Sequence, residues 1–210
     1  MGKVDTNKRL KRIAILDAAL ELFIDKGLHE TSISEIAARS GVAKGTFYLY
    51  FKDKYDIRNK LIVYQSRRML RSAYEAMLGE NLNDLEDQLI FISNHVLDQL
   101  NARKDLLILI SKNLSWGILK QEMIGSPQDE EDFLFVESFH GMTEPHGIYP
   151  PQSEIMLYLL VELMGSACYN AILYEQPCSL STLKPYLFET VRQIIRQFSK
   201  TPRETDAPVD

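Results

Sequence analysis

The residues best suited to chemistry by type and spacing lie in one short segment, Lys44 to Lys54. Lys44 carries a flexible cation, Thr46 offers a hydroxyl and a methyl group, and Tyr48 and Tyr50 offer phenolic donors. Cations and hydroxyls bind phosphate oxygens and the edges of bases, and a threonine methyl can meet the methyl of thymine. These side chains are therefore suited to recognition by charge and hydrogen bonds.

Residues of the kinds used in catalysis or metal binding are scattered along the chain. No glycine-rich phosphate loop, nucleophile elbow or cluster at metal-ligand spacing occurs in the sequence. The cysteines stand ten residues apart without a second pair. We expect no catalytic residues, metal or cofactor, and an enzyme is the first alternative from another class. The residues concerned are His29, His95, His140, His146, Cys168 and Cys178.

Charge is divided unevenly along the chain. The 210 residues have a formal net charge of -5, and their composition, 45% hydrophobic and 25% charged, is ordinary for a folded protein. Residues 1–72 hold 15 Lys and Arg against 8 Asp and Glu, whereas residues 73–210 hold 9 against 21. This asymmetry is typical of a polyanion-binding head joined to an acidic body, and a solvated basic face is the alternative.

Apolar residues recur at spacings of three and four in the N-terminal third, which predicts helices. Gly27 and Gly41 are expected to end the first two helices, because glycine adopts a positive φ without a steric penalty. Ser32 and Glu35 have the spacing of a capping box, and a second capping pair begins at Asp53. The predicted helices cover residues 8–26, 32–40, 44–51 and 54–78.

Helical spacing continues through the rest of the chain, with one interruption. The stretch 125–151 is rich in proline and glycine and should be partly irregular. The apolar run 106–110 is compatible with a buried strand, but its helical surroundings favour a helix. Residues 201–210 are predicted to be a disordered tail. The predicted helices cover residues 85–100, 106–110, 131–139, 151–174 and 183–198.

The segment from Thr31 to Lys54 resembles the TetR family of repressors, and the similarity covers roughly residues 8–60. The C-terminal two-thirds resembles the family only in length, helicity and two long final helices. Two positions depart from the pattern, since Ala43 replaces the usual serine and Ile33 stands where a polar residue is common. The matching positions are Ser32, Ile36, Ala37, Gly41, Val42, Gly45, Thr46, Phe47, Tyr48, Tyr50, Phe51 and Lys54.

This resemblance implies an all-α fold with two functional parts. Residues 1–53 would form a three-helix DNA-binding domain of the helix-turn-helix type, followed by a long linking helix over residues 54–79. Residues 80–200 would form a helical bundle for ligand binding and dimerisation, with the tail after it.

The resemblance also implies double-stranded DNA as partner. The second helix of a helix-turn-helix lies in the major groove, about 12 Å wide, with its N-terminal residues toward the bases. Phe47 and Phe51 should pack inward. The basic residues between Lys8 and Arg12 are expected either to contact DNA or to form a solvated helix face. The positions expected to touch DNA are Thr31, Ser32, Lys44, Gly45, Thr46, Tyr48, Leu49, Tyr50 and Lys54.

One DNA-binding domain of this size reads only a few base pairs, so we expect a two-fold dimer that reads two half-sites about 34–36 Å apart. We expect the helices over 155–174 and 183–198 to pair with their copies, with packing inside the monomer as the alternative. The resemblance implies a repressor of a palindromic operator, released when a small-molecule effector moves the fourth helix. Candidate effector contacts, for each of which core packing is the alternative, are Asn113, Trp116, Phe133, Phe139, His140, Tyr158 and Tyr169.

Two further questions concern location and the rival function. The charged N-terminus has no signal-peptide pattern, so we expect a cytoplasmic protein. The stretch 155–174 is apolar enough to suggest a membrane span, but Glu162 and Asn170 within it favour a helix buried against protein, and we expect no membrane partner. An architectural or division-linked DNA-binding protein with the same head and no small-molecule input is the alternative function.

Overall fold

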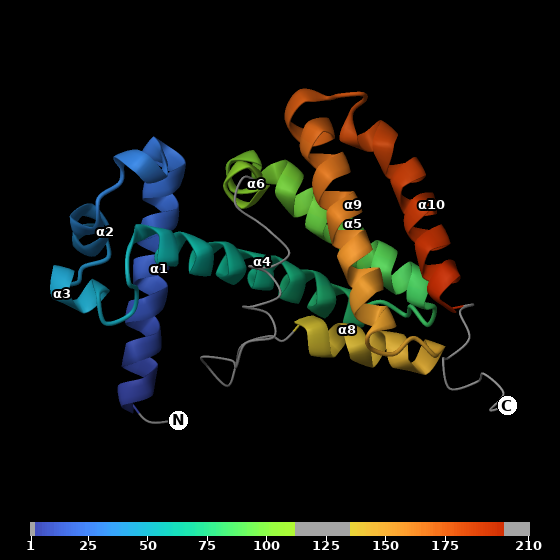
Figure 1. The fold of residues 1–210 in the computed structure, drawn as a ribbon, viewed down its shortest axis with the longest axis horizontal. Coiled ribbons are helices and arrows are strands. Elements are labelled where there is room, and N and C mark those ends of the chain that lie inside the picture. Colours follow the sequence, from blue (N-terminus) through green and yellow to red (C-terminus); the bar gives the residue numbers. More distant parts are fainter. Residues whose placement is uncertain (1–2, 112–134, 200–210) are drawn as a thin grey trace, which may run out of the picture. The chain divides into compact units, whose positions relative to one another are not determined.

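The computed structural model describes residues 3–111 and 135–199, and within these ranges it contains helices and no strand (Figure 1). The prediction of an all-α fold is therefore confirmed. The predicted tail and the predicted effector contacts Asn113, Trp116 and Phe133 lie outside the described residues. In chain order the elements are α1 (Lys3–Glu30), α2 (Ile33–Arg39), α3 (Lys44–Phe47), α4 (Lys54–Leu78), α5 (Leu85–Ala102), α6 (Lys104–Ser111), α8 (Phe135–Thr143), the 3-10 helix η1 (Glu144–His146), α9 (Gln152–Tyr174) and α10 (Leu180–Ser199).

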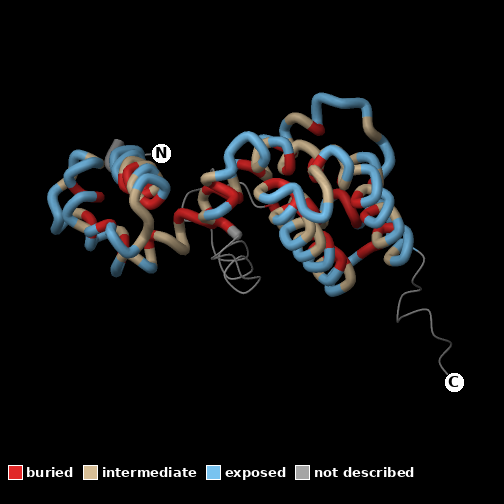
Figure 2. Tube along the Cα trace, turned by 90° about the horizontal axis from the view of Figure 1, so that it is seen from above, coloured by how far each residue is buried: buried red, intermediate tan, exposed pale blue. Residues whose placement is uncertain are grey.

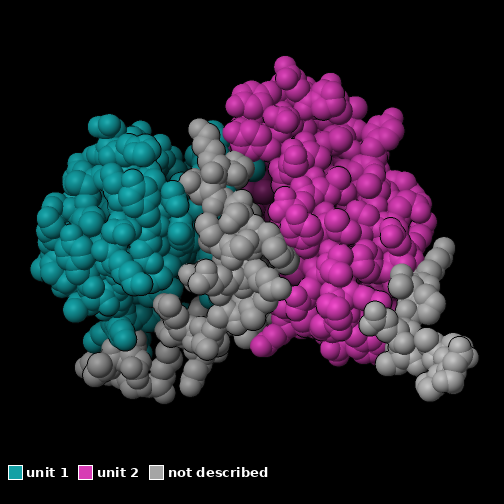
Figure 3. Space-filling view, viewed as in Figure 1, with its two compact units in different colours: residues 1–68, 105–133 teal, residues 69–104, 134–210 magenta. Residues whose placement is uncertain are grey.

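The chain divides into two compact units, coloured separately in Figure 3. Unit 1 comprises residues 1–68 and 105–133, and unit 2 comprises residues 69–104 and 134–210. The boundary at residue 68 falls inside α4, so this one helix contributes side chains to both units.

Unit 1 is organised around a single apolar cluster. Its helices α2 and α3 are only seven and four residues long, so packing against α1 and α4 must hold them in place, because short helices are marginal in water. Figure 2 shows the buried residues of these segments in red. The cluster consists of Ile15, Leu16, Ala18, Ala19, Phe23, Ile36, Phe47, Phe51, Ile57 and Leu61.

The first helix is longer than its apolar spacing predicts. It begins at Lys3. Its first turns are polar and have no hydrophobic periodicity, so the apolar spacing could not reveal that they are helical. Gly27 breaks the helical geometry with φ 82 and ψ 166, which confirms the predicted glycine stop, and three further residues continue after the kink. The third helix is shorter than predicted and ends at Phe47, because Leu49 and Tyr50 bond to carbonyls three residues back in a tighter turn.

Unit 2 contains α5, α8, α9 and α10, of which α10 packs against both α5 and α9. The apolar run after Lys104 is helical, as its context predicts, and forms α6, which belongs to unit 1 from Asp105 onward. Helix α8 runs from Phe135 to Thr143, four residues beyond the predicted end, and the predicted positions 131–134 are not described. Helix α10 begins three residues earlier than predicted, at Leu180.

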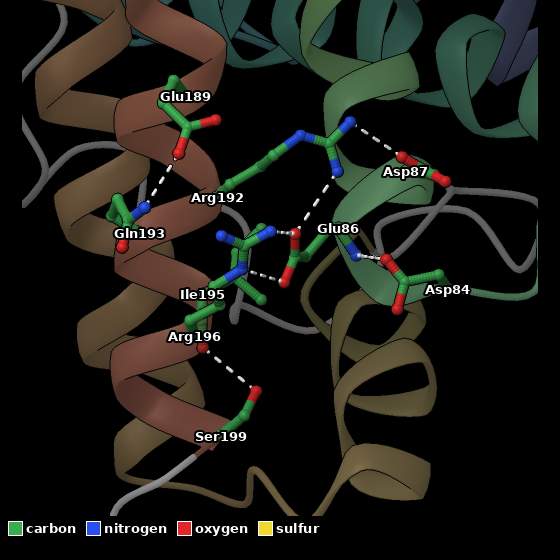
Figure 4. Close-up of polar contacts among 9 residues, drawn as sticks. All are labelled: Asp84, Glu86, Asp87, Glu189, Arg192, Gln193, Ile195, Arg196 and Ser199. Atoms are coloured by element: carbon green, nitrogen blue, oxygen red, sulfur yellow. Dashed lines mark hydrogen bonds and ion pairs between the residues drawn. The ribbon is translucent and has the colours of Figure 1, made fainter.

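A cluster of ion pairs joins the first turn of α5 to α10 (Figure 4). The Arg196 guanidinium donates from Nε to Glu86 Oε1 at 2.8 Å and from Nη2 to Glu86 Oε2 at 2.9 Å. Arg192 donates to Glu86 Oε2 at 3.3 Å and to Asp87 Oδ1 at 2.8 Å. These hydrogen bonds, first from Arg196 and then from Arg192, lower the pKa of the Glu86 carboxyl.

Helix α9 follows Pro151, as predicted, and has the length and composition of a membrane-spanning helix, with a mean hydropathy of 1.5 over its most apolar window. Only 33% of that window is buried within the described chain, although α9 packs against α8 and α10. Glu162, halfway along, is exposed. One helix of this length and composition is weak evidence for a membrane span.

Candidate nucleic-acid interface

A capping box fixes the start of α2, as the sequence predicts. The Ser32 hydroxyl accepts a hydrogen bond from the Glu35 backbone N–H at 3.2 Å, and the Ser32 N–H donates to Glu35 Oε2 at 2.8 Å. Lys26 of α1 donates to the other carboxylate oxygen of Glu35. The hydrogen bonds from Lys26 and then from Ser32 lower the pKa of Glu35 to about 2. The carboxylate thus ties the end of α1 to the first turn of α2.

The turn between α2 and α3 is tight and is held by backbone groups. Gly41 has φ 71, a conformation that a side chain would strain, and Val42 donates its N–H to the Ala37 carbonyl at 3.0 Å. Ala43 precedes α3 and supplies no side-chain cap, although its carbonyl accepts the Thr46 N–H at 2.8 Å. Backbone geometry and the packing of Phe47 therefore set the direction of α3.

The side chains of α3 and the following turn separate into an inner and an outer set. Phe47 and Phe51 are fully buried in the unit 1 cluster, with ring centroids 5.5 Å apart, as predicted. Tyr48 is 51% exposed and Leu49 is 80% exposed. Lys44 and Gly45 are also exposed, whereas Thr46 and Tyr50 are half-buried. Because two aromatic anchors fix one side of the segment, the other side presents a cation, a phenol and an apolar side chain to solvent.

The start of α4 is fixed by two carboxylates. Asp53 Oδ1 accepts the N–H groups of Tyr55 and Asp56, both at 2.8 Å, while Asp56 Oδ2 accepts the Lys52 N–H at 2.8 Å. The pair acts as a cap, although Asp56 reaches one residue further back than a capping box requires. Lys54 donates from Nζ to the His29 carbonyl at 2.9 Å, so its ammonium holds α4 to the end of α1 and is half-buried.

Thr31 has an internal role that differs from its predicted contact with DNA. It is 1% exposed, and its hydroxyl donates to the Gly27 carbonyl at 2.7 Å. A side chain so enclosed cannot reach a phosphate, because its hydroxyl already satisfies a carbonyl freed by the helix stop at Gly27. Sequence reasoning also missed Lys26, whose contact with Glu35 spans nine residues and has no local signature.

The four described candidates for effector contact lie on α8 and α9 of unit 2. Phe139 is 1% exposed and packs against Phe135 at a centroid distance of 6.0 Å, so core packing accounts for it. His140, next to it, has a buried Nε2 without a hydrogen-bond partner in the described residues. Tyr158 is 40% exposed and Tyr169 is half-buried, and eleven residues separate them by about 16 Å along α9. These four residues do not converge on one point.

The order of these elements, a capped helix, a tight turn and a short exposed helix anchored by buried side chains, defines a helix-turn-helix. Such units present their second helix to DNA. The profile described as "Bacterial regulatory proteins, tetR family" matches residues 15–61. Residues 15–61 thus carry the sequence pattern of the DNA-binding segment of this family, as the resemblance implies.

Curated relatives match about half of the chain. It is 33% identical over 108 residues to the "Fatty acid metabolism regulator protein" of Bacillus subtilis (strain 168), covering 51% of this chain and 46% of the relative. It is 33% identical over 101 residues to the "HTH-type transcriptional regulator AcrR" of Shigella flexneri, covering 47% of each. The chain thus spans about half the length of these two curated relatives.

Solved structures extend the similarity of fold over most of the chain. A tetR family transcription regulator from Shewanella sp. PV-4 aligns with a TM-score of 0.63 at 19% identity, covering 86% of this chain and 95% of that one. The fatty acid degradation regulator FadR from Bacillus halodurans aligns with a TM-score of 0.62 at 21% identity, covering 86% and 94%. At these identities the alignments show the fold, an N-terminal helix-turn-helix domain followed by a helical domain, which confirms the predicted architecture.

Proposed function

We propose that the protein is a one-component transcriptional regulator that binds a palindromic operator as a dimer and is a repressor released by a small-molecule effector. The observation that carries the DNA-binding part is the division of the α3 segment, in which Phe47 and Phe51 are buried while Lys44, Tyr48 and Leu49 are exposed. A helix held in this way can enter a major groove without losing its own core contacts.

The roles proposed for the exposed side chains follow from their chemistry. Lys44 supplies a cation for phosphate or guanine, Tyr48 a phenolic donor, and Leu49 an apolar contact of the kind that thymine methyl groups make. Gly45 has nothing within 4 Å of the Cβ position, so the backbone there can approach DNA closely. Thr31 supports the interface from inside. The residues of the proposed interface are Ser32, Lys44, Gly45, Thr46, Tyr48, Leu49, Tyr50 and Lys54.

Selection from a pool of randomised duplexes tests this proposal. Full-length protein should enrich sequences with two-fold symmetry, and the centres of the half-sites should be about 34–36 Å apart or a multiple of that distance. The operator so recovered should bind at least about 1,000-fold more tightly than random DNA at the same salt concentration. If no sequence is enriched, the protein is not a sequence-specific regulator.

The exposed apolar residues of unit 2 support pairing with a second copy through α9 and α10. Ile155 is 50% exposed, Tyr158 and Leu159 are each 40% exposed, and the three follow one another at spacings of three and one along α9. Tyr186 of α10 is 74% exposed. A two-fold axis beside α9 would bury this surface against its own copy and would place two reading heads on one duplex. Sedimentation velocity should therefore detect a dimer.

The effector proposal rests on relatives and on α4. The structure of FadR from Bacillus subtilis is a complex with stearoyl-CoA, and that of Thermus thermophilus FadR, a TetR family transcriptional repressor, is a complex with lauroyl-CoA. A long-chain acyl-CoA is therefore the first ligand to test, in a protein that we place in the cytoplasm. Because α4 contributes to both units, a ligand that prefers one position of this helix can alter DNA affinity.

Thermal denaturation and DNA binding should respond together to the true effector. Lauroyl-CoA and stearoyl-CoA are compared with free coenzyme A and with the free fatty acids, which separates recognition of the thioester from binding of either part alone. A ligand at 100 times its dissociation constant should stabilise the protein by about 2.7 kcal/mol and weaken operator binding. An architectural DNA-binding protein would bind its operator unchanged with every small molecule tested.

A further inference from the structure

The first turns of α1 extend beyond the core of unit 1. The buried residues of α1 begin at Ile15, and no side chain described before it is buried. Figure 1 shows the N-terminal end of α1 running past α3. Leu10, an apolar side chain in these turns, is 59% exposed. Packing in the core of unit 1 therefore does not explain the residue types in the first turns of α1.

These turns are basic, and their charge continues the face that packs on the core. Four of the seven residues from Thr6 to Arg12 are Lys or Arg, and none is acidic. Lys8, Arg12, Leu16, Ala19 and Phe23 succeed one another at spacings of three or four and so share one face of the helix. That face is apolar and buried from Leu16 onward, and it becomes basic where α1 leaves the core.

Two lysines of this segment point to solvent. Lys8 and Lys11 are exposed and lie one turn apart, whereas Arg9 and Arg12 are half-buried. An exposed lysine at this position costs the free protein little stability. Its contribution to binding is largest where it displaces counterions from a polyanion. The α3 segment belongs to the same unit as these lysines, so the DNA duplex that α3 is proposed to bind is the polyanion that we expect them to contact.

We propose that Lys8 and Lys11, on the protruding first turns of α1, bind phosphates of the DNA backbone outside the bases that α3 reads. This inference rests on the proposed function, because it assigns a second contact surface to the same duplex. The contacts are sequence-independent, so they set affinity and register on the DNA and leave the choice of bases to α3.

The experiment compares full-length Lys8→Ala and Lys11→Ala with Lys104→Ala, which removes an exposed lysine of unit 2. Fluorescence anisotropy measures affinity for two duplexes of about 30 base pairs, long enough for two half-sites, one of random sequence and one recovered by selection. Each titration is repeated over a range of salt concentrations. Thermal denaturation of each variant monitors the fold.

Both α1 variants should bind both duplexes several-fold more weakly at low salt, by the same factor on each. The slope of log affinity against log salt should become shallower by about 0.9 for each head that loses one phosphate contact. Lys104→Ala should behave as wild type.

Three results would overturn the inference. One is unchanged affinity and slope in both α1 variants, another is a loss confined to the selected duplex, which would indicate base reading, and the third is an equal loss in Lys104→Ala. Wild-type protein that binds neither duplex would instead refute the proposed function itself.

Discussion

Removal of the Glu86 carboxylate should destabilise unit 2 by more than the loss of one ordinary surface charge. The Glu86 side chain is 17% exposed and accepts two hydrogen bonds from Arg196 and one from Arg192. Exposed ion pairs contribute about 0.2–1 kcal/mol each, with two-point arginine contacts at the upper end. With solvent screening allowed for, Glu86→Gln should therefore lower the free energy of unfolding by about 1–1.5 kcal/mol.

Asp87→Asn is the matched control. Asp87 also lies in the first turn of α5, so its removal changes the interaction with the helix dipole in the same way. It makes a single 2.8 Å contact with Arg192, and its side chain is 50% exposed. Its loss should cost about 0.5 kcal/mol or less. Urea denaturation followed by circular dichroism, at one fixed protein concentration, measures both variants.

The effect of Glu86→Gln should also depend on pH. The arginines lower the pKa of Glu86 in the folded protein, so its contribution is fully present above the unfolded value of about 4.3 and is lost as pH falls through the folded pKa. The difference between wild type and Glu86→Gln should therefore shrink when denaturation is repeated in increasingly acidic buffer. Equal destabilisation by the two variants, or a Glu86 effect that persists undiminished in acid, would refute this reasoning.

Three further predictions concern other parts of the molecule. Phe47→Ala should lower the free energy of unfolding by about 3–5 kcal/mol and unfold the helix-turn-helix, since Phe47 is fully buried. Thermal denaturation measures this loss, and a small loss would mean that the effect is only local. Ser32→Ala should cost about 1 kcal/mol through its lost cap, measured by urea denaturation, and no loss would mean that Glu35 alone suffices. Ile155→Asp should dissociate the proposed dimer in sedimentation velocity, whereas Leu78→Asp, which places a charge at an exposed apolar residue of α4, should not.

The parts of the site that follow from local sequence could be predicted from it. The capping box at Ser32 and Glu35 and the glycine stops at Gly27 and Gly41 depend on neighbours within a few residues, and the structure contains them. The inward packing predicted for Phe47 and Phe51 is also confirmed. These features need no knowledge of the rest of the fold.

Other features depend on contacts that spacing cannot reveal. Glu86 and Arg196 are 110 residues apart in sequence, and neither lies in a recognisable motif. Thr31 is predicted to touch DNA, yet its hydroxyl donates to the carbonyl of Gly27 four residues earlier. The first turns of α1 are helical without an apolar stripe, so hydrophobic periodicity placed the start of that helix too late.

The most direct test of the account is the operator affinity of Lys44→Ala and Tyr48→Ala, with Lys104→Ala as the control. Lys44 is exposed, and Tyr48 is 51% exposed with its ring edge-on to Phe47 at a centroid distance of 5.5 Å, so thermal denaturation should show both variants folded. Each should lose about 1–3 kcal/mol of operator binding, roughly 10- to 100-fold. Wild-type affinity in both variants, with their folding intact, would contradict the claim that the outer side of α3 reads DNA.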